Sequence, residues 1–170
     1  MGERGAAMAE RGKPQFRFRA LRLRDALAAS AWRYPDEYAM YNLALAPLLV
    51  ATALRGPLSA LTGVAYYAVA SDADALVGVF SLIRRGGDVE IGVGLRPDLN
   101  GQGRGLAYVC EGLEVARRRY HPQTFSLHVA LFNRRAITVY ERAGFLPGPV
   151  TPFTYQGKRY DEMRMSRPAN

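Results

Sequence analysis

The sequence of 170 residues contains a single cysteine, Cys110. One cysteine cannot form an intramolecular disulfide, which excludes a disulfide-stabilised scaffold and favours a reducing, cytoplasmic location. Cys110 follows Val109 in a segment where apolar residues recur at helical spacing. We expect Cys110 to lie on the apolar face of that helix and to pack in the core rather than to react.

Long apolar runs are also missing. The longest apolar stretch, LALAPLLVATAL, is too short and too interrupted to span a bilayer. The first residues lack the apolar segment of a signal peptide. We therefore expect a soluble protein with no export signal and no membrane partner. With 49% hydrophobic residues, the chain should nevertheless fold as one globular domain.

Histidine is scarce, since His121 and His128 are the two in the chain. Neither has partners at metal-ligand spacing, so no metal site is expected. The sequence also shows no Ser-His-Asp or Cys-His constellation for nucleophilic catalysis.

Acidic residues are fewer than basic ones, 15 against 23, which gives a net charge of +8. Residues 1–24 hold most of the excess, because seven basic groups against two acidic groups give this segment +5. A basic arm can bind nucleic acid, but without interleaved aromatic residues or a recognition-helix pattern a solvated segment is the favoured interpretation. Residues 1–14 are small, charged and glycine-containing, and we expect them to be disordered.

The most informative stretch is VEIGVGLRPDLNGQGRGL, Val89 to Leu106. Residues 89–95 are apolar and β-branched, as in a strand, and Gly92 and Gly94 remove bulk from one flank where a ligand can approach. A glycine-rich loop then precedes an apolar pattern of helical period. Strand, glycine loop and helix predict a phosphate site, because backbone N–H groups and the positive end of the helix dipole converge at the helix start.

Two nucleotide-binding motifs do not fit this loop. A P-loop requires lysine and Ser/Thr after its last glycine, where this chain has Leu106 and Ala107. The GxGxxG fingerprint of dinucleotide-binding folds does not match the GxGxG spacing found here. A glycine turn that merely connects two elements is the remaining alternative.

The loop instead resembles the signature of the GNAT superfamily of acyl-CoA-dependent N-acetyltransferases, Gln/Arg-x-x-Gly-x-Gly/Ala. In this chain the signature falls on Asn100, Gly103 and Gly105, and Asn100 departs from the family's first residue. A second segment, NRRAITVYERAGF from Asn133 to Phe145, resembles the family's asparagine, alanine, tyrosine and Gly-Phe series.

The predicted elements follow the GNAT order, so the resemblance covers about residues 15–167. It implies an α+β fold (mixed α/β) in a single domain of residues 15–170. The central sheet should be mostly antiparallel, with six to seven strands flanked by about four helices, and should splay between its fourth and fifth strands. The predicted strands are 16–23, 64–69, 75–83, 89–95, 124–131, 150–155 and 160–165, and the predicted helices are 25–33, 47–55, 106–120 and 134–143.

Local signals support these boundaries. Asp25 is the predicted N-cap of the first helix, and Pro47 and Gly56 bracket the second. The paired glycines Gly86-Gly87 predict a hairpin turn. Gly144 should end the last helix.

The resemblance implies acetyl-CoA as the acyl donor. Its pantetheine arm would pair with the backbone of the strand that ends at Leu95, and its pyrophosphate would lie on the glycine loop. Asn133 would contact the cofactor near the pantetheine, with the N-cap of the last helix as its alternative role. The implied cofactor-binding residues are Val93, Gly94, Leu95, Asn100, Gly101, Gln102, Gly103, Arg104, Gly105, Leu106 and Asn133.

Aromatic residues concentrate near the first helix. In the GNAT family this region forms a wall of the acceptor site, so the resemblance implies that these side chains line the amine pocket. The alternative is that they fill the core beneath a helix. The residues are Trp32, Tyr34, Tyr38 and Tyr41.

The resemblance also implies catalytic groups. Tyr140 matches the tyrosine that protonates the CoA sulfur in many GNAT enzymes, although packing under the cofactor is its alternative role. Glu90 or His128 is expected to be the general base. Strand alternation places Glu90 on the face of Gly92 unless a bulge intervenes, and an imidazole can take a proton at neutral pH. Asp88 is a third, weaker candidate.

The sequence therefore predicts an N-acetyltransferase that passes the acetyl group of acetyl-CoA to a primary amine by direct attack in a ternary complex. The acceptor would be a small amine, a peptide or a protein amine, and the few carboxylates near the aromatic wall argue against a polyamine. A homodimer is compatible with the sequence. The rival function is a catalytically silent acyl-CoA-binding module whose basic arm contacts nucleic acid.

Overall fold

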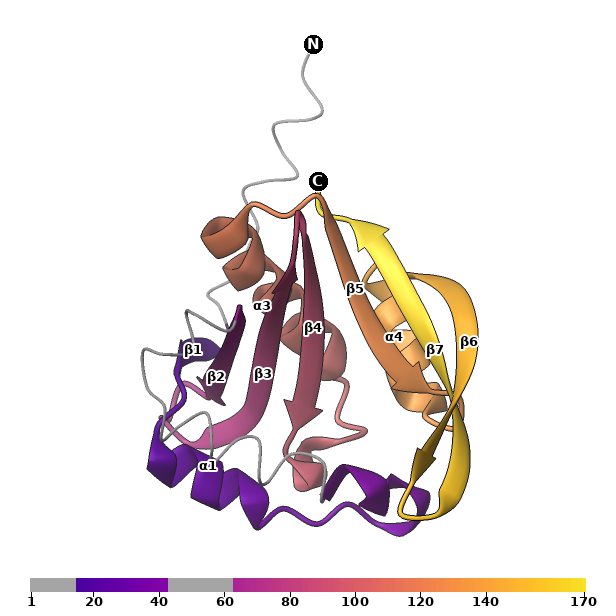
Figure 1. Ribbon diagram of the computed structural model, residues 1–170. Helices are drawn as coiled ribbons and strands as arrows, with labels where there is room; N and C mark the ends of the chain where they lie inside the picture. The colour runs from indigo at the N-terminus through magenta and orange to yellow at the C-terminus, as the bar shows by residue number, and fades with distance from the viewer. Residues whose placement is uncertain (1–14, 43–62) are drawn as a thin grey trace.

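The structure is a computed structural model that describes residues 15–42 and 63–170. These residues form one seven-stranded sheet with the order β1-β2-β3-β4-β5-β7-β6 (Figure 1). The strands are β1 (Arg17–Ala20), β2 (Val64–Ala70), β3 (Leu76–Arg85), β4 (Asp88–Leu95), β5 (Thr124–Ala130), β6 (Leu146–Tyr155) and β7 (Lys158–Pro168). The helices are α1 (Leu23–Ser30), α3 (Gly105–Tyr120) and α4 (Arg134–Arg142), with short 3₁₀ helices η2 (Asp36–Ala39) and η4 (Pro97–Leu99).

Neighbouring strands of the described sheet are antiparallel, except for β4 and β5, which run parallel. The β4–β5 ladder ends at the pair Glu90–Ser126. Beyond this pair the strands diverge like the arms of a V (Figure 1). We call the diverging segments, residues 91–95 of β4 and 127–130 of β5, the β4–β5 fork. The mostly antiparallel sheet and the splay between its fourth and fifth strands are both confirmed.

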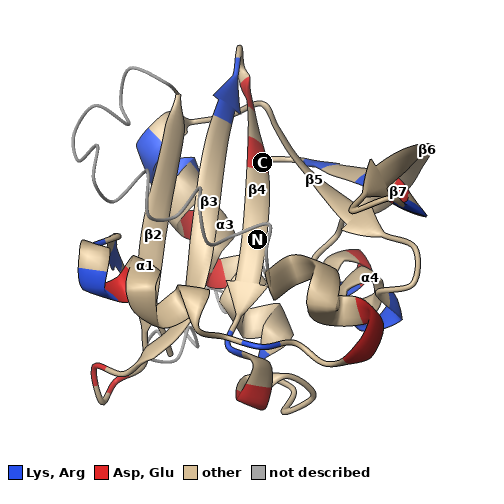
Figure 2. Cartoon of the chain, turned by 60° about the horizontal axis from the view of Figure 1, so that its bottom comes forward, with Lys and Arg blue, Asp and Glu red and all other residues tan. Residues whose placement is uncertain are grey.

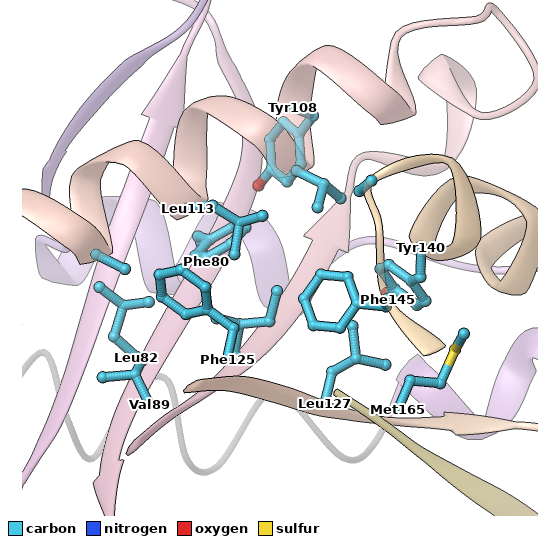
Figure 3. Close-up of a cluster of buried hydrophobic side chains, with 14 of the residues drawn as sticks. Phe80, Leu82, Val89, Tyr108, Leu113, Phe125, Leu127, Tyr140, Phe145 and Met165 are labelled. Atoms are coloured by element: carbon cyan, nitrogen blue, oxygen red, sulfur yellow. The ribbon is translucent and has the colours of Figure 1, made fainter. Parts of the chain in front are cut away.

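One face of the sheet carries the main hydrophobic core beneath α3 and α4. Alternate strand residues point to this face, and Phe80 and Phe125 are at most 1% exposed. Figure 3 shows both rings near Leu113 of α3, with Tyr140 of α4 in the same cluster. The core therefore reaches the α4 side of the fork.

The opposite face of the sheet is covered in part by α1. Its residues Ala26 and Ala29 pack on Tyr66 of β2 and Val79 of β3. Small side chains at these helix positions allow α1 to lie close to the strands.

The first strand and helix differ from the prediction at their junction. β1 ends at Ala20 and α1 begins at Leu23, so Asp25 lies in the first helical turn and is not the N-cap. Its carboxylate accepts the backbone N–H of Arg22 at 2.9 Å. It also accepts two hydrogen bonds from Arg19, at 2.6 and 2.8 Å. The helix therefore begins two residues earlier than predicted. The ion pair with Arg19 accounts for the difference, because it holds Asp25 against β1.

The prediction that Cys110 packs in the core is wrong, because its side chain is exposed. The buried face of α3 is centred on Tyr108 and Gly112 instead. A Cβ atom at Gly112 would lie 2.4 Å from Phe80, so this glycine lets the helix approach the sheet along a different stripe. Partial desolvation raises the pKa of the Cys110 thiol, which disfavours the reactive thiolate.

Strand β6 forms an edge of the sheet and pairs with β7 through a tight hairpin. The hairpin turns at Gln156 and Gly157, both with positive φ, as type I′ turns require. β6 begins at Leu146, earlier than predicted, because prolines and a register shift between Pro147 and Val150 obscure its alternation. Its side chains are largely exposed.

Two expectations fall on residues that the structure does not describe: the helix 47–55 and the disordered segment 1–14. Within the described ranges, no helix is both long enough and apolar enough to cross a membrane.

Candidate active site

The backbone of β4 directs unpaired groups into the fork. The Arg96 N–H donates to the Val77 carbonyl at 2.8 Å. Because the β3–β4 register is continuous, the backbone groups of the even-numbered β4 residues point towards β3. Val93 and Leu95 consequently direct their backbone groups away from β3, towards β5. The Leu95 carbonyl confirms this direction, because it accepts the hydroxyl of Tyr34 at 2.8 Å.

The glycines of β4 serve internal packing more than ligand access. A Cβ atom at Gly92 would lie 2.2 Å from the Ser81 Oγ, so a hydroxyl fills that flank of the strand. The prediction of a bare flank is wrong at this position. The Gly94 carbonyl accepts the hydroxyl of Tyr108 at 3.2 Å. A Cβ atom at Gly78 would lie 2.2 Å from the same hydroxyl. Glycine at position 78 therefore makes room for the fully buried Tyr108.

The glycine loop after η4 is open and shaped for an anion. Gly101 and Gly103 have φ of 77° and 75°, and a Cβ atom on either would meet nothing within 4 Å. No side chain among the described residues caps the start of α3, so the N–H groups of its first turn remain available to a ligand. Arg104 is exposed beside them.

The other polar residues around the loop make hydrogen bonds within the protein. The Gln102 amide donates to the Asp98 carbonyl at 2.8 Å and so folds back onto η4. Asp98 is itself held by Arg96 at 2.7 Å, and this hydrogen bond lowers the pKa of Asp98. The Asn100 N–H donates to the Pro97 carbonyl at 3.2 Å.

A close helix–helix contact links the loop to α4. A Cβ atom at Gly105 would lie 3.1 Å from a methyl group of Val139. Glycine at this position therefore brings α4 next to the start of α3. The two signature segments of the sequence, which are far apart in the chain, meet here.

Asn133 occupies the N-cap of α4, as the alternative interpretation predicted. Its Oδ1 accepts the Ala136 N–H at 3.2 Å. Its amide also donates to the hydroxyl of Tyr41 at 3.3 Å. The residue thus connects α4 to the aromatic segment after α1.

Four tyrosines meet at the fork: Tyr34, Tyr41, Tyr108 and Tyr140, which we call the tyrosine quartet. The rings of Tyr34 and Tyr41 lie 6.2 Å apart between centroids, and the hydroxyls of Tyr34 and Tyr108 donate to the neighbouring carbonyls of Leu95 and Gly94. Besides burial, Tyr41 contributes to the raised pKa of Tyr140, and Tyr140 contributes to that of Tyr108. Tyr108 and Tyr140 come from the helices on the core face, whereas Tyr34 and Tyr41 come from the segment after α1. The fork therefore places hydroxyl groups from both of its sides in one region.

Burial keeps the quartet protonated. It raises the pKa of Tyr34 to about 12 and raises the pKa values of Tyr41, Tyr108 and Tyr140 as well. Tyr140 is 8% exposed and its ring meets Phe145 edge-on at 6.1 Å. Among the described residues, the Tyr140 hydroxyl has no hydrogen-bond partner, so its proton is available to a ligand.

The predicted aromatic wall is extended by residues that sequence reasoning missed. Phe132, in the β5–α4 loop, packs against Tyr38 at 5.6 Å and Tyr41 at 6.3 Å between ring centroids. Tyr160 of β7 continues the row at 5.9 Å from Phe132. Trp32 differs from its neighbours, because it packs against the cluster under α1 as the core alternative proposed.

A cavity of about 780 Å³ lies between the segment after α1 and the β6–β7 hairpin. Tyr160 is the member of the aromatic row that lines it, whereas the four predicted wall residues do not. The charged lining is mixed, with Asp36 and Glu37 against Arg33 and Lys158. No single sign of charge dominates this surface.

Both candidate bases project from the same face of the sheet. The β3–β4 register has no bulge, so Glu90 lies on the face of Gly92 as predicted. The parallel pair Glu90–Ser126 then places Ser126 and His128 on that face too. Glu90 accepts a hydrogen bond from Arg85 at 2.9 Å, and Figure 2 shows the basic end of β3 beside the acidic start of β4.

His128 has a partner that could not be expected from the sequence alone. Its Nδ1 lies 3.3 Å from Oε1 of Glu162 on β7. The partner arises from strand pairing, because β7 lies antiparallel beside β5 with Ala130 opposite Glu162. Pairing between strands this far apart in the chain is not visible in a single sequence.

Comparison with known proteins agrees with the fold and the two signature segments. The sequence model of the Acetyltransferase (GNAT) domain matches residues 15–146. A chimera of the spermidine N-acetyltransferase SpeG from Vibrio cholerae and hSSAT has a TM-score of 0.77 at 20% identity, covering 91% of this chain and 96% of that chain. The Vibrio cholerae spermidine N-acetyltransferase in complex with CoA and spermine has a TM-score of 0.71 at 19% identity, covering 92% and 97%. At these identities the likeness establishes the fold. A search of curated proteins gave no match.

Proposed function

Since the chain belongs to the GNAT family of acetyltransferases, with acetyl-CoA as its acyl donor, we propose that it acetylates a primary amine by direct attack in a ternary complex at the β4–β5 fork. One observation carries the proposal. The fork joins three features in one place: β4 backbone groups without a strand partner, an open glycine loop, and an unpartnered Tyr140 hydroxyl.

The donor is assigned to the loop and to the β4 arm of the fork. The pyrophosphate is proposed to accept hydrogen bonds from the residues of the loop and the first turn of α3, 100–106. The pantetheine arm is proposed to lie along Val93, Gly94 and Leu95 as a short extra strand. It would displace the Tyr34 hydroxyl from the Leu95 carbonyl. Asn133 is proposed to contact the arm near α4.

Tyr140 is proposed to serve the leaving group. Burial raises the pKa of its hydroxyl, so the group is protonated throughout the neutral range. It can therefore donate a hydrogen bond to the sulfur as negative charge develops there. Burial strengthens that interaction, because the effective dielectric constant is low around Tyr140, which is 8% exposed, and Phe145, which is 1% exposed.

The acceptor is proposed to reach the fork from the side of the aromatic row. Tyr38, Tyr41 and Phe132 form an apolar surface with hydroxyl tips, which suits the body of a small amine or a peptide N-terminus. The two solved structures compared above are named spermidine N-acetyltransferases. The mixed charge around the nearby cavity does not select a polycation, so spermidine is one member of the test set and not the assigned substrate.

The proposal is tested by following free thiol released from acetyl-CoA. The amines should include phenylethylamine, spermidine, a peptide with a free N-terminus and a peptide with one free lysine. We expect release with at least one of them, and a product heavier than the amine by one acetyl group. CoA binding without thiol release from any amine would favour the catalytically silent module instead.

Replacing Tyr140 by phenylalanine tests the leaving-group assignment. Loss of the proton donor should lower kcat by about 10- to 100-fold while the Kd of CoA changes little. Tyr67→Phe is the matched control, since Tyr67 is also buried but lies on β2 and outside the quartet. It should keep full turnover, and unchanged turnover in Tyr140→Phe would remove Tyr140 from this role.

A further inference from the structure

We propose that Glu162 on β7 positions His128 on β5 as the general base of the reaction, by holding the imidazole through its Nδ1. The inference rests on the proposed function and deepens it by choosing between the candidate bases. Glu162 is a positioning residue in this scheme, and His128 is the group that touches the amine.

The position of His128 fits the role. The β4–β5 ladder ends at Glu90–Ser126. Because alternate residues share a face, His128 is the first residue beyond that last pair whose side chain lies on the face of Ser126. β5 remains paired with β7 throughout this region, with His128 opposite Arg164. The imidazole is therefore carried near the closed end of the fork by a strand that is paired with β7 on its other edge.

The contact with Glu162 favours one tautomer of His128. The Nδ1 atom lies 3.3 Å from Oε1 of a carboxylate, which has only acceptor atoms, so a bare Nδ1 lone pair there would be repelled and a proton on Nδ1 is favoured. The Nε2 atom then carries the free lone pair that a base needs. The side chains are 37% and 30% exposed, so the pair lies at the surface, where a small ligand can contact the imidazole.

The charged groups around His128 distinguish it from Glu90. Arg164 lies opposite it on β7 and Glu162 lies beside it. The carboxylate of Glu90, on β4, forms an ion pair with Arg85 at the end of the β3–β4 hairpin. The charge of Glu162 is a minor contribution to the raised pKa of Tyr41, whose main cause is burial.

The proposed step conserves atoms and charge. His128 Nε2 takes one proton from the ammonium group of the acceptor, and the free amine attacks the thioester carbonyl. A C–N bond forms and the C–S bond breaks. The thiolate leaves with the electron pair of the C–S bond and takes a proton from Tyr140. The attacking nitrogen loses a second proton to solvent, and Tyr140 takes up one proton from solvent in place of the one that it gave to the thiolate. His128 releases its proton to solvent.

The kinetic test uses acetyl-CoA and the amine with the highest turnover in the thiol-release screen. His128→Ala should lower kcat by about 100-fold, and added imidazole should restore at least about tenfold of it. Glu162→Ala should lower kcat by about tenfold, with the KM for acetyl-CoA changed less than about twofold. Glu162→Gln should fall between Glu162→Ala and the unchanged protein, because an amide oxygen can still accept from Nδ1.

The matched control is Asp161→Asn. Asp161 is the neighbouring residue of β7, is exposed, and by strand alternation lies on the other face. Its replacement removes the same charge and should leave kcat within about twofold.

Nitrogen-15 NMR of the imidazole gives a second readout that does not depend on activity. His128 should show the Nδ1–H tautomer in the unchanged protein and lose that preference in Glu162→Ala. The chain has one other histidine, so the spectrum of His128→Ala assigns the signals. An Nε2–H tautomer in the unchanged protein would overturn the proposal.

The kinetic outcomes separate this inference from the proposed function. If His128→Ala keeps its turnover while Glu90→Gln loses about 100-fold, Glu90 is the base and the inference fails alone. If imidazole does not restore activity and Glu162→Ala raises KM without lowering kcat, the pair is structural only. If no amine releases thiol, the proposed function fails, and the role of His128 fails with it.

Discussion

At the scale of single residues, Asp25 shows how one buried carboxylate joins two elements. It is 5% exposed and accepts hydrogen bonds from the Arg19 guanidinium and the Arg22 N–H. The guanidinium is the main cause of the lowered pKa of Asp25. Removing the carboxylate would leave both donors without their partner, which costs more than the bonds contribute net.

Asp25→Ala should therefore destabilise the protein by about 2–4 kcal/mol in urea unfolding. Asp74→Asn is the control, because Asp74 makes a similar 2.7 Å ion pair with Arg17 but both side chains are more than half exposed, and asparagine tolerates the φ of 61° at this position. It should cost less than about 1 kcal/mol. Equal losses for the two variants would contradict the role given to burial.

The same pair predicts a pH dependence with a definite sign. The folded-state pKa of Asp25 is lowered from its ordinary value near 3.8, so its contribution is fully present above that value and is lost as pH falls through the folded-state pKa. The difference in unfolding free energy between the unchanged protein and Asp25→Asn should be constant near neutral pH and shrink below about pH 4. A difference that grows on acidification would exclude this explanation.

At the scale of elements, the glycine loop depends on backbone conformation more than on side-chain size. Gly103 has φ of 75° with open space around its missing Cβ. Alanine there meets strain and no clash, whereas asparagine tolerates positive φ better.

Gly103→Ala should therefore raise the Kd of CoA by about tenfold and destabilise the protein by about 1 kcal/mol. Gly103→Asn should be milder in both respects. Calorimetric titration with CoA and thermal unfolding measure the two effects. The opposite ranking would mean that side-chain bulk, and not backbone strain, limits the site.

Elements differed in how far the sequence could predict them. Strands and helices with clear periodicity, such as β4 and α3, were placed to within a residue or two, and the two signature segments identified the family. The N-cap at Asn133 and the turn at Gly144 followed from local chemistry. These features depend on residues close in the chain, which a single sequence displays directly.

The missed features all depend on contacts between distant elements. Tyr108 owes its position to space at Gly78, and Glu162 meets His128 through the β5–β7 register. Phe132 is central to the aromatic row, although only its loop position is visible in the sequence. The exposure of Cys110 likewise follows from how closely α3 approaches Phe80 at Gly112.

At the scale of the whole molecule, net charge governs the encounter with the donor. The chain carries +8, and acetyl-CoA carries several phosphate charges. Attraction between them accelerates association and is screened by salt. Residues 1–14 contain three basic groups against two acidic ones, so nearly all of the net charge belongs to the rest of the chain.

The association rate of CoA, measured by stopped flow, should therefore fall several-fold between about 20 and 500 mM salt. Deletion of residues 1–14 should leave that salt dependence almost unchanged. Loss of the dependence on deletion would place the attraction in the N-terminal segment. A salt-sensitive affinity for RNA that disappears with the deletion would instead support the nucleic-acid alternative.

The edge strand β6 has a consequence for behaviour at high concentration. Pro147, Pro149 and Pro152 lack the N–H groups that another strand would need for continuous pairing. An exposed sheet edge is otherwise a template for aggregation between chains. The prolines interrupt this template along the border where Leu146 and Val150 are exposed. The absence of these three backbone N–H donors therefore disfavours the addition of further strands and growth into fibres.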